Sequence, residues 1–272
     1  MKKISIFTTM TNPEKRMDPW KEALNCYEDF ADEIIITGDD WPEEFTWDHI
    51  GKTFHEGFEK STGDWVIRMD LDYFFHERSI NKFKKLLNDY NEFPAVAFPQ
   101  YQIFTPDRYQ VKTKLCIALN KKKFPNIVLN GGGDLCAPTI NGKQILNKDV
   151  PFLNIPIYQY DSVFRTKDVI AADRARFARA WYRYFNEWAD RGGETPEEAF
   201  DAWYKMVSIK YKKHVHKLKD SEHPKYINDK LYSLNENQFG FNAFGLKHIT
   251  KFSKFEYLKS NKNKFFDNIN SK

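Results

Sequence analysis

Short apolar runs alternate with amphipathic stretches through the first part of the chain. Each apolar run has the length and β-branched content of a buried strand, and each amphipathic stretch carries apolar residues at helical spacing. The pattern predicts strands over 3–9, 32–37 and 65–69, and helices over 19–30 and 46–60. An order of strand, helix, strand, helix, strand is typical of a parallel α/β sheet.

The rest of the chain divides into a second half of the sheet and a helical region. We expect a helix over 77–90, two strands over 94–104 and 112–119 that form a hairpin, and a last strand over 151–160. Helices are predicted over 167–189 and 195–213, the second beginning at Thr195-Pro196-Glu197-Glu198 with an early proline and first-turn acids. The sequence thus predicts an α/β domain over 1–165 and a helical extension over 166–272.

Composition narrows the class of protein. With 41% hydrophobic and 17% aromatic residues among 272, the chain can build a large core and is not a disordered polymer. No apolar run approaches the roughly 20 residues of a transmembrane helix, and the N-terminus lacks the pattern of a signal peptide. Cys26, Cys116 and Cys136 include no CxxC pair, which argues against a disulfide framework or a cysteine zinc site. We therefore expect a cytoplasmic protein.

Polar clusters follow all three predicted strands of the first half. Ligands bind beyond the carboxyl ends of such strands, and Thr8-Thr9, Asp39-Asp40 and Asp70-Leu71-Asp72 stand there. Two carboxylates at positions i and i+2 can hold a hard divalent cation, which can also bridge a diphosphate. The alternative is a solvated acidic turn.

These motifs resemble the nucleotide-sugar half of a family-two-like GT-A glycosyltransferase. The resemblance covers residues 3–90 and rests on Ala31-Asp32-Glu33-Ile34-Ile35-Ile36, Gly38-Asp39, Gly63-Asp64-Trp65-Val66-Ile67 and Asp70-Leu71-Asp72. It implies a GT-A-like mixed sheet flanked by helices, and transfer of a sugar from a nucleoside diphosphate sugar to an acceptor hydroxyl. It also implies Mn²⁺ or Mg²⁺ as cofactor.

The resemblance further implies a role for each matching residue. Asp39 or Asp40 would contact the base, Lys52 would be the family's basic residue in the following helix, and Thr8 and Thr9 would approach the nucleoside. Asp72 would ligate the metal directly. Asp70 would lie nearer the ribose or a metal-bound water. Arg68 would face either a phosphate or a neighbouring carboxylate.

The later half departs from the family pattern. Related sequences carry a His-Tyr pair after a late strand, with the histidine as a third metal ligand, whereas this chain has Tyr158-Gln159-Tyr160-Asp161. Asp161 or a water would then complete the metal site. An inverting transfer also needs a carboxylate base. Asp134, after three glycines, is the first candidate and Glu77 is the second. The alternative for Asp134 is a capping Asp in a plain turn, and the alternative for Glu77 is a first-turn helix acid.

Four arginines follow the last predicted strand: Arg165, Arg174, Arg176 and Arg179. They suit a diphosphate or a phosphorylated acceptor. The alternative is that they form ion pairs with Asp168 and Asp173.

Charge is distributed unevenly along the chain. Residues 201–272 contain 15 lysines and seven acids, a net charge of +8, while residues 1–200 carry −4. This lysine-rich quarter suits a polyanion such as DNA with hydroxymethylated bases, as in phage-type DNA modification, or a surface glycan at an anionic membrane. It also suits an ordinary solvated surface. A nucleotidyltransferase and a non-catalytic nucleotide- or nucleic-acid-binding module are the alternative functions.

Overall fold

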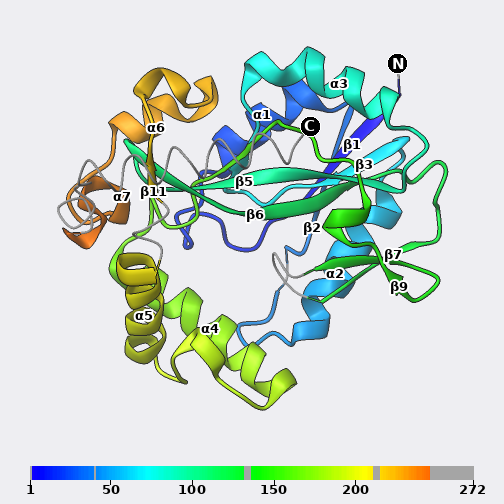
Figure 1. Cartoon of the computed structure of the whole chain (residues 1–272). Helices are drawn as coiled ribbons and strands as arrows, with labels where there is room; N and C mark the ends of the chain where they lie inside the picture. The colour runs from blue at the N-terminus through cyan, green and yellow to red at the C-terminus, as the bar shows by residue number, and fades with distance from the viewer. Residues whose placement is uncertain (1, 40, 132–135, 211–214, 246–272) are drawn as a thin grey trace.

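A mixed eight-stranded sheet forms the centre of the molecule (Figure 1). The computed structural model describes residues 2–39, 41–131, 136–210 and 215–245. The strands of this sheet are β1 (Ile4–Thr9), β2 (Glu33–Thr37), β3 (Trp65–Arg68), β4 (Tyr73–Phe74), β5 (Ala95–Thr105), β6 (Arg108–Leu119), β10 (Ile157–Gln159) and β11 (Val215–Lys217). They run in the order β2-β1-β3-β6-β5-β10-β4, and β11 pairs with β6.

Strand directions divide the sheet into two parts. β1 is parallel to both β2 and β3, as the sequence predicts. β6 runs antiparallel to β3 and to β5, while β10 is parallel to β5. The predicted fold class, a GT-A-like mixed α/β sheet flanked by helices, is confirmed.

Helices cover both faces of the sheet. Helices α1 and α3 lie over one face and α2 lies against the other (Figure 1); their bounds are α1 (Trp20–Phe30), α2 (Trp47–Lys60) and α3 (Ile80–Asp89). Side chains of β1 alternate between the two: Ile4 and Ile6 pack with α1, whereas Phe7 packs with α2. Gly57 of α2 permits this contact, because a Cβ there would lie 2.4 Å from the Phe7 ring.

A small second sheet was not foreseen from the sequence. It contains β7 (Ile127–Asn130), β8 (Ala137–Ile140) and β9 (Lys143–Gln144), all antiparallel. Gly51 of α2 lets the end of β7 approach, since a Cβ there would lie 2.9 Å from the backbone nitrogen of Gly131. The strand predicted over 151–160 is shorter than expected. Only Ile157–Gln159 forms a strand, and Phe152 makes an isolated bridge to Ala97.

The predicted C-terminal helices are present, with earlier ends. Helix α4 (Lys167–Phe185) stops where Asn186 adopts a left-handed conformation with φ of 55°. Helix α5 (Pro196–Lys205) begins with the expected cap, a reciprocal pair of hydrogen bonds between Thr195 and Glu198, and continues as a π-helical turn over Met206–Lys210. Two short helices follow, α6 (Asn228–Tyr232) and α7 (Phe239–Asn242). None of the helices in the described part of the chain is long and apolar enough to span a membrane.

Candidate functional site

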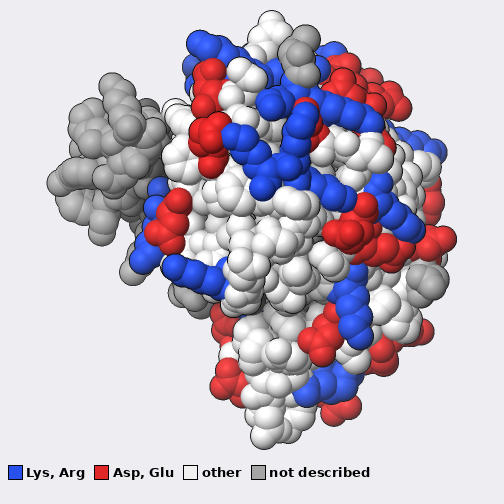
Figure 2. Space-filling view, turned by 90° about the vertical axis from the view of Figure 1, so that its right-hand side faces the viewer, with Lys and Arg blue, Asp and Glu red and all other residues white. Residues whose placement is uncertain are grey.

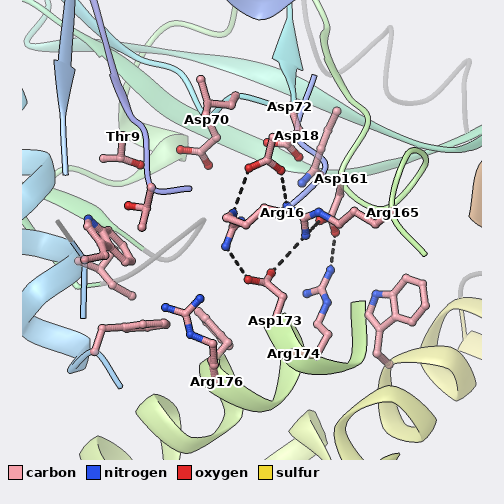
Figure 3. A pocket seen from close by; sticks show the side chains of 18 of the residues that line it. Thr9, Arg16, Asp18, Asp70, Asp72, Asp161, Arg165, Asp173, Arg174 and Arg176 are labelled. Atoms are coloured by element: carbon pink, nitrogen blue, oxygen red, sulfur yellow. Dashed lines mark hydrogen bonds and ion pairs between the residues drawn. The ribbon is translucent and has the colours of Figure 1, made fainter. Parts of the chain in front are cut away.

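A cavity of about 400 Å³ opens at the carboxyl ends of β1 and β3. Thr9, Asp70 and Asp72 reach it from these strand ends, as predicted from the α/β pattern (Figure 3). Helices α4 and α5 supply the opposite wall. The region predicted as a separate extension after residue 165 therefore builds part of the same cavity. Aromatic side chains complete the walls: Trp41, Phe45, Phe54, Phe177 and Trp203.

Hydrogen bonds from four directions fix the turn that carries Asp70 and Asp72. The Tyr27 hydroxyl of α1 donates to the backbone oxygen of Asp70 at 2.6 Å, and the backbone of Tyr73 donates to the same oxygen at 2.8 Å. The backbone of Tyr160 donates to the Asp72 backbone oxygen at 2.9 Å. The preceding Met69 donates to Phe7 of β1 at 3.0 Å. Both aspartates thus sit on a rigid support.

Arg68 takes the second of its two predicted roles. Its guanidinium is buried, lies 4.7 Å from the Phe54 ring centre, and donates to the Asp70 carboxylate at 3.2 and 3.3 Å. It therefore contacts a neighbouring carboxylate rather than open cavity.

Other predicted donor-site residues lie apart from the cavity wall. Thr8 is fully buried on the α1 face of the sheet, because side chains alternate along β1 and Thr9 takes the cavity side. Asp39 and Lys52 are exposed, and neither lines the cavity. Asp40 lies outside the described residues.

Of the two predicted base candidates, Glu77 is not brought into the cavity. Glu77 lies in a 3₁₀ turn before α3, 3.1 Å from Nδ1 of His76, and accepts a hydrogen bond from the backbone of Lys225 at 3.0 Å. It does not line the cavity. Asp134 lies outside the described residues. The assignment of a base remains a sequence prediction.

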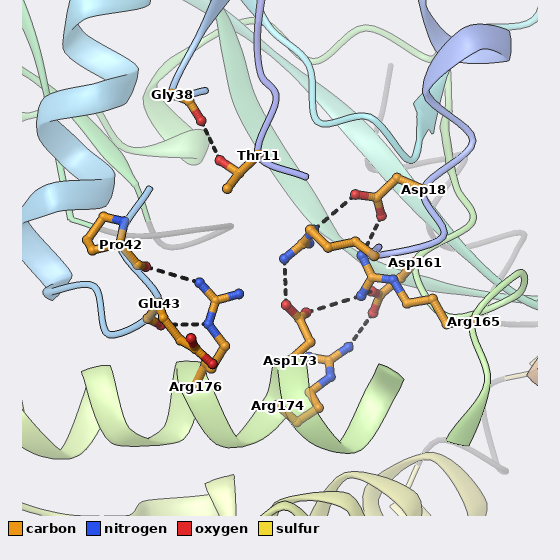
Figure 4. Close-up of polar contacts among 11 residues, drawn as sticks. Thr11, Asp18, Gly38, Pro42, Glu43, Asp161, Arg165, Asp173, Arg174 and Arg176 are labelled. Atoms are coloured by element: carbon orange, nitrogen blue, oxygen red, sulfur yellow. Dashed lines mark hydrogen bonds and ion pairs between the residues drawn. The ribbon is translucent and has the colours of Figure 1, made fainter. Parts of the chain in front are cut away.

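A network of arginines and aspartates, in which Asp18 and Arg165 are buried, lies beside Asp72 (Figures 3 and 4). Arg165 contacts Asp18 at 2.6 Å, Asp173 at 3.2 Å and Asp161 at 3.4 Å. Arg16 joins Asp18 at 3.0 Å to Asp173 at 2.5 Å. Arg174 donates to the second oxygen of Asp161. The network ties the loop after β1 to the segment after β10 and to helix α4.

Sequence reasoning found only part of this network. It offered ion pairing with Asp173 as one reading of the arginines, and that pairing is present. It missed Arg16 and Asp18, which lie about 150 positions from their partners in the chain. No local pattern reports such a contact.

The pKa values of the network carboxyls Asp161 and Asp173 are lowered, whereas the pKa of Asp72 beside the network is raised. Burial alone would raise the pKa of Asp173, but Arg16 and Arg165 hold it well below the usual value. At Asp161, burial again acts to raise the pKa, but Arg174 and Arg165 outweigh it and the pKa is lowered. The pKa of Asp72 is raised well above its usual value by burial, and by the nearby carboxylates of Asp161 and Asp70.

The three predicted metal ligands do not fit Mn²⁺ or Mg²⁺ in this arrangement. Asp70 is held by Arg68, and both carboxylate oxygens of Asp161 are held by Arg165 and Arg174. A hard cation needs several oxygen ligands at short range. Within the described ranges, no three His, Cys, Asp or Glu side chains form a group that could hold a metal ion. Asp161 belongs to the arginine network rather than to a ligand set.

Comparisons with known proteins give a distant structural likeness. No protein-family model matches the chain. No curated protein matches it either. Among solved structures, TarS 1–349 of S. aureus has a TM-score of 0.34 at 9% identity, over 76% of this chain and 79% of that one. Its complex with UDP has a TM-score of 0.38 at 10% identity, and its complex with UDP-GlcNAc 0.37 at 10%. Both complexes cover 91% of this chain and 89% of theirs.

Because the pKa of Asp72 is raised in the fold, replacing it with the neutral isostere asparagine is expected to increase stability in a pH-dependent way. A carboxyl whose pKa is raised on folding costs stability once the pH exceeds its ordinary value, since the fold favours the neutral form. Asp72→Asn is therefore expected to raise the melting temperature at about pH 8 and to change it little at about pH 4. The exposed Asp168→Asn is the control for the same chemical change. A lower melting temperature for Asp72→Asn at both pH values would contradict the assigned environment.

Proposed function

We propose that this chain transfers a glycosyl group from a nucleoside diphosphate sugar to an acceptor hydroxyl. One observation carries the proposal. The strand ends that bear Thr9, Asp70 and Asp72 open on a single cavity that also contains arginines of α4 and several aromatic rings (Figure 3). Such a site offers hydrogen-bond acceptors for sugar hydroxyls, stacking surfaces for a base or sugar, and cations for phosphates.

The reaction places specific demands on this cavity. The acceptor oxygen forms a bond to the anomeric carbon, and the bond from that carbon to the phosphate oxygen breaks. The acceptor proton passes to a base or to water, and the nucleoside diphosphate leaves with the bonding electrons. Guanidinium groups placed beside the phosphate oxygens stabilise the negative charge that develops there. We assign Asp70 and Asp72 to the hydroxyl groups of the ribose or the transferred sugar.

The charge of the protein surface, rather than the cavity, bears on which acceptor is used. On the face shown in Figure 2, Lys and Arg side chains are mixed with Asp and Glu, so that face has no single sign. The excess of lysine lies in residues 201–272, of which 211–214 and 246–272 are outside the described residues. Binding to duplex DNA that weakens steeply with salt would favour a DNA acceptor. Binding to anionic vesicles and not to DNA would favour a surface glycan.

A thermal shift panel tests the donor class. Nucleoside diphosphates, nucleotide sugars and nucleoside triphosphates are compared with and without Mn²⁺. A ligand at 100 times its Kd should add about 2.7 kcal/mol of stability. One nucleoside diphosphate and its sugar should stabilise the protein, and Asp70→Asn should reduce the effect of the sugar while the exposed Asp168→Asn should not. Stabilisation by a triphosphate alone would instead favour a nucleotidyltransferase.

A further inference from the structure

Arg176 differs from every other arginine around the cavity. Its Nε donates to the backbone oxygen of Glu43 at 2.7 Å and its Nη2 to that of Pro42 at 3.2 Å. The guanidinium also lies 5.4 Å from the centre of the Phe45 ring. Among the described residues, no carboxylate forms an ion pair with it. Asp173 lies near enough to interact with its charge, but that carboxylate is already paired with Arg16 and Arg165, so Arg176 brings an unpaired guanidinium to the cavity wall.

The neighbouring arginines are already neutralised. Arg16 and Arg174 bind Asp173 and Asp161, and Arg179, one turn along α4, binds the carboxylate of Glu44. Arg183 binds Glu44 as well, at 2.9 Å. Arg176 is therefore the α4 arginine whose charge a bound anion would complement.

The contacts of Arg176 also fix its orientation. A guanidinium has five N–H groups. Two of them donate to backbone carbonyls of the loop before α2, which holds the plane in place and leaves three for a ligand. Figure 3 shows the side chain rising from α4 into the cavity, on the side where Thr9 and Asp70 lie, and Figure 4 shows its contacts with Pro42 and Glu43. A planar donor group with three available N–H groups is suited to phosphate oxygens.

The positions of the charges in the cavity, rather than their sum, favour an anion over a divalent cation. Six acidic and six basic side chains line it, so their formal charges cancel. A cation at Asp70 and Asp72 would lie among guanidiniums, because Arg68 contacts Asp70 and Arg165 contacts the adjacent Asp161. An anion beside Arg176 meets a guanidinium that forms no ion pair with a carboxylate of the described residues and donates only to backbone oxygens there.

We propose that Arg176 binds the diphosphate of the nucleotide-sugar donor, and that the donor binds without a divalent cation. This inference rests on the proposed function, because it takes a nucleoside diphosphate as the ligand. Arg176 then supplies part of the positive charge that a carboxylate-bound metal would otherwise provide. Arg16 and Arg174 of the network line the same cavity (Figure 3).

Calorimetric titration tests this assignment with the full chain. The nucleoside diphosphates UDP, GDP, ADP, CDP and dTDP are titrated in EDTA and again with MnCl₂, each into wild type and Arg176→Ala. One of them should bind in EDTA with a Kd that MnCl₂ leaves unchanged. Loss of charge-assisted hydrogen bonds in Arg176→Ala should weaken that binding by about tenfold or more.

Three further arms separate phosphate recognition from a structural effect. Arg179→Ala removes a neighbouring arginine of α4 and should leave the affinity unchanged. Arg176→Lys keeps the charge but not the fork, and should give an intermediate affinity. The nucleoside without phosphates should bind wild type and Arg176→Ala equally, whereas inorganic pyrophosphate should bind wild type more tightly.

Two results would overturn the inference in distinguishable ways. Binding that appears only with MnCl₂, or that is the same in Arg176→Ala, would refute the arginine site and leave the proposed function standing. Absence of binding by all five diphosphates under both conditions would refute the proposed function together with the inference.

Discussion

Replacing Arg165 with methionine is expected to lower the free energy of unfolding by about 3–5 kcal/mol, because Asp18, Asp161 and Asp173 each lose one of the two arginines that hold them. The guanidinium and the Asp18 carboxylate are 5% and 6% exposed and lie 2.6 Å apart. Asp161 and Asp173 lose a cation at the same time. Urea denaturation at neutral pH measures the change.

The control for Arg165→Met is Arg183→Met. Arg183 also forms an ion pair, with Glu44 at 2.9 Å, but its side chain is 41% exposed. An exposed pair contributes about 0–1 kcal/mol. Equal losses in the two variants would contradict a stabilising role for the buried network.

The difference in stability between wild type and Arg165→Met is expected to depend on pH. The pKa values of Asp161 and Asp173 are lowered in the fold by the arginines around them. Their contribution is therefore complete above the ordinary aspartate pKa and is lost as the pH falls through the lowered values. The difference between wild type and Arg165→Met should shrink in acid.

Replacing Tyr27 with alanine is expected to cost about 3–5 kcal/mol, because it removes a fully buried aromatic ring from between α1 and the sheet. The hydroxyl has a separate role. It donates to the backbone oxygens of Asp70 at 2.6 Å and Tyr73 at 3.2 Å, which hold the turn at the cavity.

Tyr27→Phe separates the two contributions. It keeps the ring and should cost about 0.5–1.5 kcal/mol for the lost hydrogen bonds. If the hydroxyl positions the Asp70–Asp72 turn, Tyr27→Phe should also weaken binding of the nucleotide sugar. Equal stability of Tyr27→Phe and Tyr27→Ala, measured by urea denaturation, would show that ring packing contributes nothing.

Local patterns predicted the first half of the fold because they act over short distances. The apolar runs gave β1, β2 and β3 to within a residue or two, and the amphipathic stretch gave α2 to within one residue. The rule that ligands gather at strand carboxyl ends placed Asp70 and Asp72 in the cavity. It failed to separate Thr8 from Thr9, because side chains alternate along β1 and only the assembled fold shows which face of the sheet the cavity occupies.

The other features depend on contacts between distant segments. The two-residue strand β4 has no periodicity to detect, and it exists because Tyr73 and Phe74 pair with β10. The pairing of Asp18 with Arg165 is set by the fold, as is the entry of Trp203 from α5 into the cavity wall. Arg176 was one of four equivalent arginines in the sequence, and only its surroundings distinguish it.

The most direct test of sugar transfer is a measurement of product. Each nucleotide sugar that stabilises the protein is incubated with it and with candidate acceptors, namely hydroxymethylated DNA and surface polysaccharide fractions. Chromatography and mass spectrometry then follow the free nucleoside diphosphate and the acceptor mass. We expect the nucleoside diphosphate to appear together with one added sugar on one acceptor. A nucleotide sugar that binds but remains intact with every acceptor would contradict transfer and would favour a binding module.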